Sequence, residues 1–258
     1  MKVSVIIPNF NYDQYIEQAI NSVLNSNFDR NEMEIIVVDD ASTDNSVVVI
    51  EKLMYHSKFP FRLVRNEVNM GLTLSRNRGI VHSLGEFLFF LDSDNYIHEN
   101  CIKTHYEILR ADQDAIACYS PIQDFLDGTF ENQNMRSNHP FDYTLLLQGP
   151  YIDAMAMFQK KSLIEIGMYN HKMPPYGWED YELWLRLGKL DKKVLFVPSA
   201  PLSYYRIHNL NMSTNFSPDQ YNHLVYFLKQ YYPIRLELKK SNTLDGLVTQ
   251  IYKYENPI

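Results

Sequence analysis

Cysteine is scarce in this sequence, with only Cys101 and Cys118 among 258 residues. The two form no C-x-x-C pair, which argues against a disulfide framework or a cysteine zinc site and fits a reducing compartment. Long apolar runs are also missing. None approaches the roughly 18 residues of a membrane span, and no cleavable signal follows the first strand-like segment. We therefore expect a cytoplasmic protein.

Basic charge and glycine-rich phosphate loops are missing as well. The formal net charge is -7, whereas a general nucleic-acid binder needs a basic face for the phosphate backbone. Neither G-x-G-x-x-G nor G-x-x-x-x-G-K-[ST] occurs in the sequence, so a dinucleotide-binding fold and a P-loop are both unsupported. We expect no nucleic-acid partner, but a nucleotide that carries a metal ion is compatible with this charge.

What the sequence does contain is an ordinary globular composition, 45% hydrophobic and 21% charged, and a repeated β-α pattern in its first 110 residues. Strand-like apolar segments alternate with segments whose apolar residues recur at helical spacing. This alternation is typical of an α/β fold with a mostly parallel sheet. The expected strands cover residues 3–7, 34–38, 61–64 and 87–91, with helices between them and near 99–110.

Beyond residue 95 the pattern is less regular. The polar segment 124–140 is predicted to be a loop. An apolar stripe at helical spacing within 221–232 predicts a C-terminal helix, which can pack on the core, form a homodimer face or touch a membrane surface peripherally. The other expected elements are strands near 115–120 and 193–197 and helices near 161–166 and from Glu179.

Two carboxylates separated by one residue, Asp92 and Asp94, follow the apolar run 87–91. A buried strand of this kind ends at the edge where open α/β sheets bind ligands. The carboxylates there can hold one hard cation and, through it, a diphosphate. The alternative is a polar turn, which Asp, Ser and Asn form readily. These residues alone favour neither interpretation.

Two further clusters lie where the first two expected strands end. Phe10, two residues after Pro8, can flank a base or sugar ring, although an aromatic residue at a strand end more often packs. Asp39 and Asp40 follow the second strand. One of them can accept a hydrogen bond from a pyrimidine imide N–H, or it can cap the following helix.

A third cluster combines Asn69, Gly71 and Arg76. It places a cation on a helix that faces the same strand ends, where the cation can help to hold an anionic nucleotide. As a bare spacing the signal is weak. Gly71 can serve only the turn, and Arg76 can pair only with surface carboxylates.

In the second half, Trp178 precedes Glu179 and Asp180 at the predicted start of a helix. Acidic residues in a first helical turn usually compensate the helix dipole. The alternative is a general base, because a carboxylate beside an indole is partly desolvated and can take a proton from an alcohol. His208 follows an expected strand and can complete a metal shell, although a lone histidine is more often structural.

Taken in order, these motifs resemble those of the family 2 glycosyltransferases. Members of that family begin with V-S-V-I-I-P-x-[FY]-N, continue through V-V-D-D-x-S-x-D and N-x-G-x-x-x-x-R-N, and reach L-D-x-D. The resemblance covers about residues 2–214 and is far less specific for donor or acceptor than for the family. The matching segments are residues 3–11, 37–44, 69–77, 91–94, Trp178 to Asp180, and Tyr205 to His208.

The resemblance implies a GT-A fold, a Rossmann-like and mostly parallel sheet with helices on both faces. Residues 1–215 would form one glycosyltransferase domain. Its nucleotide-sugar-binding half would cover about 1–110 and its acceptor half 111–215, fused without a linker. Residues 216–258 would then be a C-terminal helical extension.

The resemblance also implies roles for individual residues. Asp180 would be the catalytic base, chosen over its neighbour on the family pattern alone. Trp178 and Glu179 would contact the acceptor or the sugar. Asp92, Asp94 and His208 would bind Mn²⁺ or Mg²⁺. The nucleotide-sugar contacts would be Pro8, Phe10, Asp40, Asn69, Arg76, Asp92 and Ser93.

The implied reaction is a single in-line displacement that inverts the anomeric carbon of a nucleotide-sugar donor. UDP is favoured because Asp40 suits uracil. The acceptor would be a hydroxyl group of a glycan or a lipid-linked saccharide in bacterial surface polysaccharide synthesis. A cytoplasmic enzyme of this kind can lie peripherally at the inner membrane face. The competing hypothesis is a non-catalytic relative that binds a nucleotide sugar or a protein partner.

Overall fold

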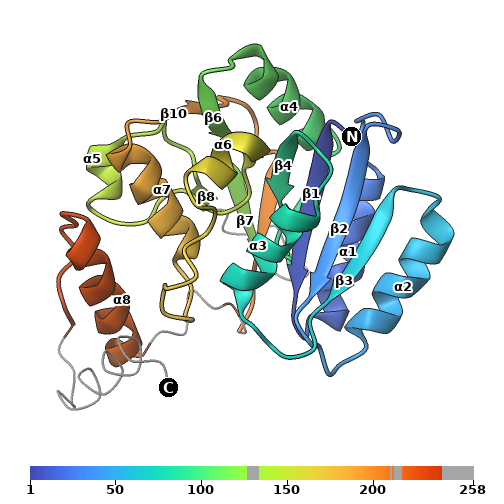
Figure 1. Cartoon of the computed structure of the whole chain (residues 1–258), viewed down its shortest axis with the longest axis horizontal. Coiled ribbons are helices and arrows are strands. Elements are labelled where there is room, and N and C mark those ends of the chain that lie inside the picture. The colour runs from blue at the N-terminus through green and yellow to red at the C-terminus, as the bar shows by residue number, and fades with distance from the viewer. Residues whose placement is uncertain (127–133, 210, 212–216, 240–258) are drawn as a thin grey trace.

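The computed structural model describes residues 1–126, 134–209, 211 and 217–239 (Figure 1). Strands and helices alternate up to residue 90, as the apolar pattern predicts, and a short strand at 96–97 that the pattern did not predict then precedes the helix at 101–111. Figure 1 shows α2 and α8 at opposite ends of the molecule. The elements of this first part are β1 (Val3–Asn9), α1 (Asp13–Leu24), β2 (Met33–Asp39), α2 (Ser46–Ser57), β3 (Phe61–Arg65), α3 (Leu72–His82), β4 (Phe87–Phe90), β5 (Tyr96–Ile97) and α4 (Cys101–Ala111).

The second part of the chain contains shorter strands and more irregular connections. Its last helix starts at a capping box, in which Ser217 and Gln220 each bond the other's backbone N–H, and Pro218 occupies the first turn. The elements are β6 (Ala115–Tyr119), β7 (Ile122–Leu126), β8 (Met135–Arg136), α5 (Tyr143–Leu146), β9 (Met157–Gln159), α6 (Lys160–Glu165), α7 (Glu179–Lys189), β10 (Lys193–Phe196), β11 (Ser203–Ile207) and α8 (Pro218–Tyr231).

A seven-stranded central sheet has the order β10-β6-β9-β4-β1-β2-β3. β1 runs parallel to both β2 and β4, with Val5 opposite Ile35 on one side and Phe89 on the other. Only β9 runs antiparallel to its neighbours β4 and β6 within the described residues. The prediction of a mostly parallel α/β sheet is therefore confirmed.

Helices cover both faces of this sheet, and the alternation along β1 shows how. Val5 and Ile7 belong to an apolar cluster that includes residues of α1, α2 and α4. Ile6 points to the other face, because successive strand side chains alternate, and joins a cluster with α3, α6, α7 and α8. Each face of the sheet thus has its own apolar core, as the GT-A expectation requires.

A glycine allows α3 to lie close to the sheet. A Cβ atom on Gly79 would stand 2.4 Å from Cγ2 of Ile6 and 3.4 Å from Cγ2 of Val38. The absence of a side chain at this position therefore fixes how near the helix comes to β1 and β2, and with it the position of the α3 side chains that face the ends of these strands.

A second, four-stranded sheet has the order β5-β11-β7-β8 and was not anticipated from the sequence. Residues 124–126 pair in parallel with Tyr205 to Ile207 of β11, and Met135 pairs with Gln123. The prediction of a loop over 124–140 is therefore wrong for 124–126 and 135–136, while 127–133 lie outside the described residues. Local polarity did not reveal a strand whose hydrogen-bond partner is about 80 residues away.

The C-terminal helix α8 packs on the core. Leu224, Val225 and Leu228 are buried in the same cluster as the apolar side of α7. Of the predicted extension 216–258, the parts at 216 and 240–258 lie outside the described residues. No helix in the described part of the chain has the length and apolar composition needed to cross a membrane.

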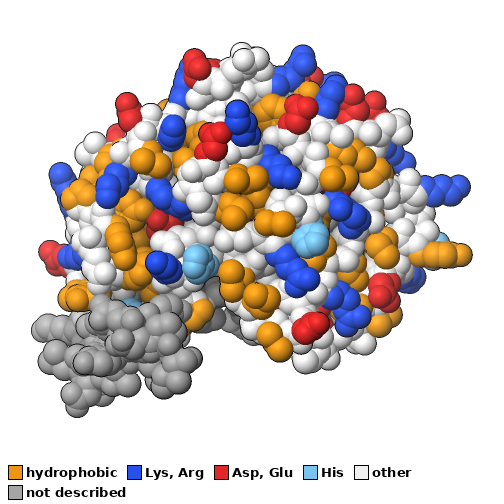
Figure 2. Space-filling view, in the orientation of Figure 1, with side chains coloured by type: hydrophobic (Ala, Val, Ile, Leu, Met, Phe, Trp, Pro, Cys, Tyr) orange, Lys and Arg blue, Asp and Glu red, His pale blue; other side chains and the backbone are white. Residues whose placement is uncertain are grey.

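On the face shown in Figure 2, Lys and Arg side chains are scattered among acidic and apolar ones. The coloured residues of this face do not gather into a single basic patch.

Candidate active site

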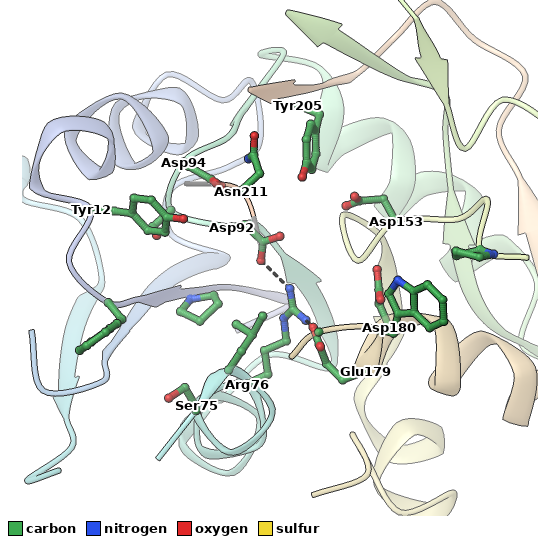
Figure 3. A pocket seen from close by; sticks show the side chains of 18 of the residues that line it. Tyr12, Ser75, Arg76, Asp92, Asp94, Asp153, Glu179, Asp180, Tyr205 and Asn211 are labelled. Atoms are coloured by element: carbon green, nitrogen blue, oxygen red, sulfur yellow. Dashed lines mark hydrogen bonds and ion pairs between the residues drawn. The ribbon is translucent and has the colours of Figure 1, made fainter. Parts of the chain in front are cut away.

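A cavity of about 890 Å³ lies at the carboxyl ends of β1, β2 and β4, between them and the start of α7 (Figure 3). The edge is the one at which open α/β sheets bind ligands. His208 is not among the lining residues, but it contacts Asp94, which is. The other predicted site residues all line the cavity: Pro8, Phe10, Asp40, Asn69, Arg76, Asp92, Ser93, Asp94, Trp178, Glu179 and Asp180.

Asp40 fastens the loop before α3 to the end of β2. Its Oδ1 accepts hydrogen bonds from the backbone N–H of Met70 at 2.8 Å and from Nδ2 of Asn66 at 2.5 Å. Its Oδ2 accepts from the N–H of Gly71 at 2.8 Å. Gly71 has φ of +87°, a backbone conformation that costs glycine little, and it immediately precedes α3. The carboxylate therefore positions α3 as well as lining the cavity.

The acidic pair lies just after β4, and its second member contacts the histidine that follows β11. Oδ2 of Asp94 lies 3.0 Å from Nε2 of His208. Burial raises the pKa of Asp94, and the hydrogen bond to His208 partly offsets this effect. The imidazole ring lies against the rings of Tyr15 and Tyr12, with centroids 4.9 and 5.7 Å away. The aromatic rings therefore restrict the orientation of the metal-binding candidate His208.

Arg206 explains how a residue from the end of the chain reaches the acidic pair. Its backbone N–H donates to Oδ1 of Asn95 at 2.9 Å, and its Nε donates to the carbonyl of Asp94 at 2.9 Å. Its guanidinium lies 4.6 Å from the centre of the Tyr15 ring. These contacts bind β11 to the turn after β4, so His208, two residues later, lies beside Asp94.

Asp180 lies in the first turn of α7 and opens into the cavity. Its Oδ1 accepts a hydrogen bond from the backbone N–H of Tyr181 at 2.7 Å. Burial raises the pKa of Asp180 well above its usual value, the charges of Glu179 and Asp153 add to this effect, and Arg76 opposes it. A carboxylate with a raised pKa is better matched to accepting a proton near neutral pH.

The residue before α7 has an uncommon backbone conformation. Trp178 is in the left-handed region, with φ of +66° and ψ of 14°, which is sparsely populated for a bulky side chain. Its indole meets the rings of Tyr181 and Tyr221 edge to face, with centroids 5.6 Å away in both cases. The helix α8 thus supports one wall of the cavity through Tyr221.

Sequence reasoning missed Asp153, a third carboxylate that points into the same space as Asp92 and Asp180 (Figure 3). Its backbone is held on both sides, because its N–H donates to Oγ of Ser137 and its carbonyl accepts from Nε1 of Trp184. Burial raises the pKa of Asp153 to about 6, and the charge of Asp92 contributes. Its only signal was a single acidic residue in the apolar stretch 151–158.

The second sheet contributes further lining residues that the motifs did not indicate. Tyr205 of β11 and Arg136 of β8 both line the cavity. The Arg136 guanidinium lies 3.9 Å from the centre of the Tyr205 ring and forms an ion pair with Asp124 of β7. Their place in the site depends on the strand pairing of the second sheet, which the sequence pattern did not predict.

The predicted metal ligands fit a divalent cation that arrives with a nucleotide. Within the described ranges, no group of three or more His, Cys, Asp or Glu side chains is arranged to hold a metal ion by itself. Asp94 and His208 are in contact, whereas Oδ1 of Asp92 is engaged by Arg76 at 2.5 Å. The carboxylate of Asp94 and the second oxygen of Asp92, completed by diphosphate oxygens and water, would suit Mg²⁺ or Mn²⁺, with the imidazole of His208 beside them.

Comparisons with known proteins point to one family. Residues 4–167 match the family model described as Glycosyl transferase family 2. The poly(ribitol-phosphate) beta-N-acetylglucosaminyltransferase TarS of Staphylococcus aureus is 38% identical over 104 residues, which are 40% of this chain and 18% of TarS. The GalNAc(5)-diNAcBac-PP-undecaprenol beta-1,3-glucosyltransferase of Campylobacter jejuni is 24% identical over 249 residues, 95% of this chain and 77% of that protein.

Solved structures agree with the fold. The crystal structure of S. aureus TarS 1-349 in complex with UDP-GlcNAc matches with a TM-score of 0.72 at 22% identity, over 92% of this chain and 68% of that one. The mannosyltransferase PcManGT from Pyrobaculum calidifontis, in complex with GDP-Man and Mn²⁺, matches with a TM-score of 0.65 at 15% identity. The match covers 99% of this chain and 70% of PcManGT. These matches confirm the predicted GT-A fold. Because the family model covers more than half of the 258 residues, the chain belongs to glycosyl transferase family 2.

Proposed function

We propose that this protein is a metal-dependent, inverting glycosyltransferase that moves a sugar from a nucleoside diphosphate to a hydroxyl group. One observation carries the proposal. The acidic pair Asp92 and Asp94, with His208 behind it, and the carboxylate of Asp180 face one cavity from elements far apart in the sequence. A donor diphosphate held at the first group would have its anomeric carbon between the two.

The nucleoside would lie at the end of the cavity formed by β1 and β2, where Pro8 and Phe10 offer apolar surface and Asn69 and Ser93 polar groups. The carboxylate of Asp40 accepts three hydrogen bonds in the protein. Because a carboxylate has about four acceptor positions, one is left for the imide N–H of uracil. UDP is therefore the donor nucleotide we propose.

Asp94 and His208, together with Asp92, would hold the divalent cation, which when bound neutralises the diphosphate and stabilises the charge on the departing nucleoside diphosphate. This chain has few cations of its own for that task. In the described part of the cavity wall, the arginines are Arg76 and Arg136, and each forms an ion pair with a carboxylate. A cation from solution would supply the charge that these side chains do not.

The chemical step is a displacement at the anomeric carbon. The acceptor oxygen forms a bond to that carbon while the bond to the diphosphate oxygen breaks, and the leaving oxygen keeps the electron pair. Asp180 takes the hydroxyl proton as attack begins. Attack from the face opposite the leaving group inverts the configuration, so an α-linked donor gives a β-glycoside.

The acceptor would enter over Trp178, whose fixed indole forms part of the wall. The relatives in S. aureus and C. jejuni are named for transfer to poly(ribitol-phosphate) and to an undecaprenol-linked saccharide, which supports a glycan or lipid-linked acceptor in bacterial surface polysaccharide synthesis. This chain spans only 18% of TarS, so the acceptor is proposed at the level of chemical class. A cytoplasmic location at the inner membrane face belongs to the same proposal.

The experiment that tests the function is a calorimetric titration of the protein with UDP and with GDP, each with and without Mn²⁺, followed by an assay of UDP release from UDP-sugars. We expect UDP to bind more tightly with Mn²⁺ than without it. We also expect at least one UDP-sugar to be turned over slowly with water as acceptor.

Two outcomes would contradict the proposal. If neither nucleotide binds under any of these conditions, the donor site is absent. If UDP binds with Mn²⁺ but no UDP-sugar is consumed even with acceptor glycans present, the chain is the non-catalytic binding relative that the sequence left open.

A further inference from the structure

Arg76 is the most deeply buried cation at the cavity among the described residues, with 1% of its surface exposed. One guanidinium nitrogen, Nη2, bonds Oδ1 of Asp92 at 2.5 Å, and the other, Nη1, bonds Oε1 of Glu179 (Figure 3). A single side chain of α3 therefore connects the acidic motif after β4 with the first turn of α7.

The guanidinium is held by a rigid frame. The next residue, Asn77, exchanges two hydrogen bonds with the backbone of Tyr169, one at 2.8 Å and one at 2.9 Å. The Tyr169 ring lies 5.3 Å from the guanidinium. Because Gly79 brings α3 against β1, the helix that carries Arg76 has little freedom to move. The position of Arg76 is thus set by packing before any ligand binds.

The carboxylate of Glu179 is part of this bridge, whereas the carboxylate of Asp180 faces the cavity. Glu179 is ion-paired inside the protein, whereas the contact of Asp180 is with the N–H of Tyr181 in its own helix. Between the two adjacent acids, Asp180 is therefore the one placed to meet an acceptor hydroxyl. The structure gives a physical basis for a choice that the sequence could make only by family resemblance.

We propose that Arg76 and Glu179 are positioning residues: by bonding Asp92 with one nitrogen and Glu179 with the other, Arg76 holds the catalytic base Asp180 at a fixed place relative to the donor-binding motif. This inference rests on the proposed function, because it assigns Asp180 as the base. It departs from the sequence prediction, in which Arg76 contacts the nucleotide and Glu179 contacts the acceptor or the sugar.

The bridge also sets the charge around the base. The charged groups that act on the pKa of Asp180 are Glu179 on its own helix, Asp153 before β9 and Arg76 on α3, and Asp180 in turn helps to raise the pKa of the nearby Tyr169 hydroxyl. Removing the negative charge of Glu179 lowers the pKa of Asp180, and removing the positive charge of Arg76 raises it. The two substitutions therefore act in opposite directions on one group, although both break the same bridge.

The test compares Glu179→Gln, Arg76→Gln and the double variant with the parent protein. Turnover of the UDP-sugar is measured against pH, and UDP binding with Mn²⁺ is measured by calorimetry. We expect the acid limb of the kcat profile to move down by about half a pH unit or more in Glu179→Gln and up by a similar amount in Arg76→Gln. UDP affinity in Glu179→Gln should stay within about threefold of the parent value, since Glu179 does not touch the donor in this proposal.

The kcat losses should also be non-additive. Both single substitutions break the same bridge. The kcat of the double variant should therefore lie no more than about threefold below that of the worse single variant. Arg65→Gln, at an exposed arginine that ends β3, is the matched control and should leave the profile in place. Arg76→Lys, which keeps the charge but cannot bond both carboxylates in the same way, should lie between the parent and Arg76→Gln.

A readout that needs no turnover separates this inference from the proposed function. The carboxyl carbon of Asp180, labelled with ¹³C and assigned by its loss in Asp180→Asn, reports the pKa directly by NMR. Opposite shifts with an inactive parent would overturn the function and keep the bridge. The positioning role would be overturned in favour of direct substrate contact by either of two results. One is a kcat loss in the double variant equal to the product of the two single losses, and the other is a loss of UDP affinity in Glu179→Gln.

Discussion

The first 111 residues and the rest of the chain build the site in different ways. In the first part, the predicted site residues lie at the carboxyl end of a strand of the central sheet, in the loop after it or on the following helix, as Asp40, Arg76 and Asp92 show. In the second part, Asp180 lines the cavity and His208 contacts Asp94 because of contacts with elements far away in the sequence, such as the bonds of Arg206 to the turn after β4. Local order supplies the donor-side residues, and long-range contacts bring the others to them.

The largest effect is expected from the second part alone. Asp180→Asn keeps the shape of the side chain but removes the base, so kcat should fall by about a thousandfold, within the usual range for general base catalysis. UDP affinity with Mn²⁺ should stay within about threefold, because the donor-side residues are untouched. Single-turnover assays and calorimetry on the same preparation measure both quantities. A parallel loss of UDP affinity would show that the two parts of the site are not separable in this way.

A smaller effect should appear where the two parts meet. Asp94→Asn, in the first part, and His208→Ala, in the second, should each weaken Mn²⁺-dependent UDP binding by about 10–100-fold, because both side chains would hold the same cation. Binding without metal should change little in either variant. His56→Ala, at an exposed position of α2, is the control. Normal metal dependence in His208→Ala would restrict the metal site to the acidic pair of the first part.

An added methyl group should have different effects on stability at a glycine of the first part and at a glycine of the second. Gly79→Ala should destabilise the protein by about 1–3 kcal/mol, the usual cost of overpacking, because the added methyl group would overlap Ile6. Among the described residues, the methyl group of Gly149→Ala would meet only Leu236, at 3.8 Å, so this change should alter the free energy of unfolding by no more than about 0.5 kcal/mol. Urea unfolding measures both. Equal effects would mean that α3 can shift on the sheet, which would also weaken the frame around Arg76.

The smallest expected effect concerns the buried carboxylate that the sequence did not reveal. Burial raises the pKa of Asp153 to about 6, so its ionised form disfavours the folded state. This penalty is absent below the pKa of the unfolded chain, near pH 4, and is complete above about pH 6. Asp153→Asn should therefore stabilise the protein by about 1–2 kcal/mol at pH 8 and have little effect near pH 4.

Thermal unfolding across this pH range measures the effect. Asp191→Asn, on the exposed turn after α7, keeps a residue type that tolerates the left-handed backbone at that position and serves as the control. A stabilisation by Asp153→Asn that does not change with pH would show that the charge of Asp153 is compensated in the folded state.

Much of the first part could be predicted, because its elements are specified within short windows. The alternation of Val5, Ile6 and Ile7 between two cores is a local pattern, and the strands and helices up to residue 90 agree with the prediction made from such patterns. The prediction was wrong for the strand that contains Asp124, because this polar segment becomes a strand only by pairing with β11. A hydrogen-bond partner about 80 residues away leaves no periodic signal in either segment.

The sequence by itself determined the family, the parallel sheet, and the acids and arginine that the motifs contain, since each of these is encoded by residues close together in the chain. Only the tertiary structure decided what those residues contact. In the folded protein, Glu179 forms an ion pair with Arg76 and Asp180 faces the cavity. Asp153 lines the same wall. The physical reason is that charge, burial and pKa depend on distances in space, which a linear motif does not contain.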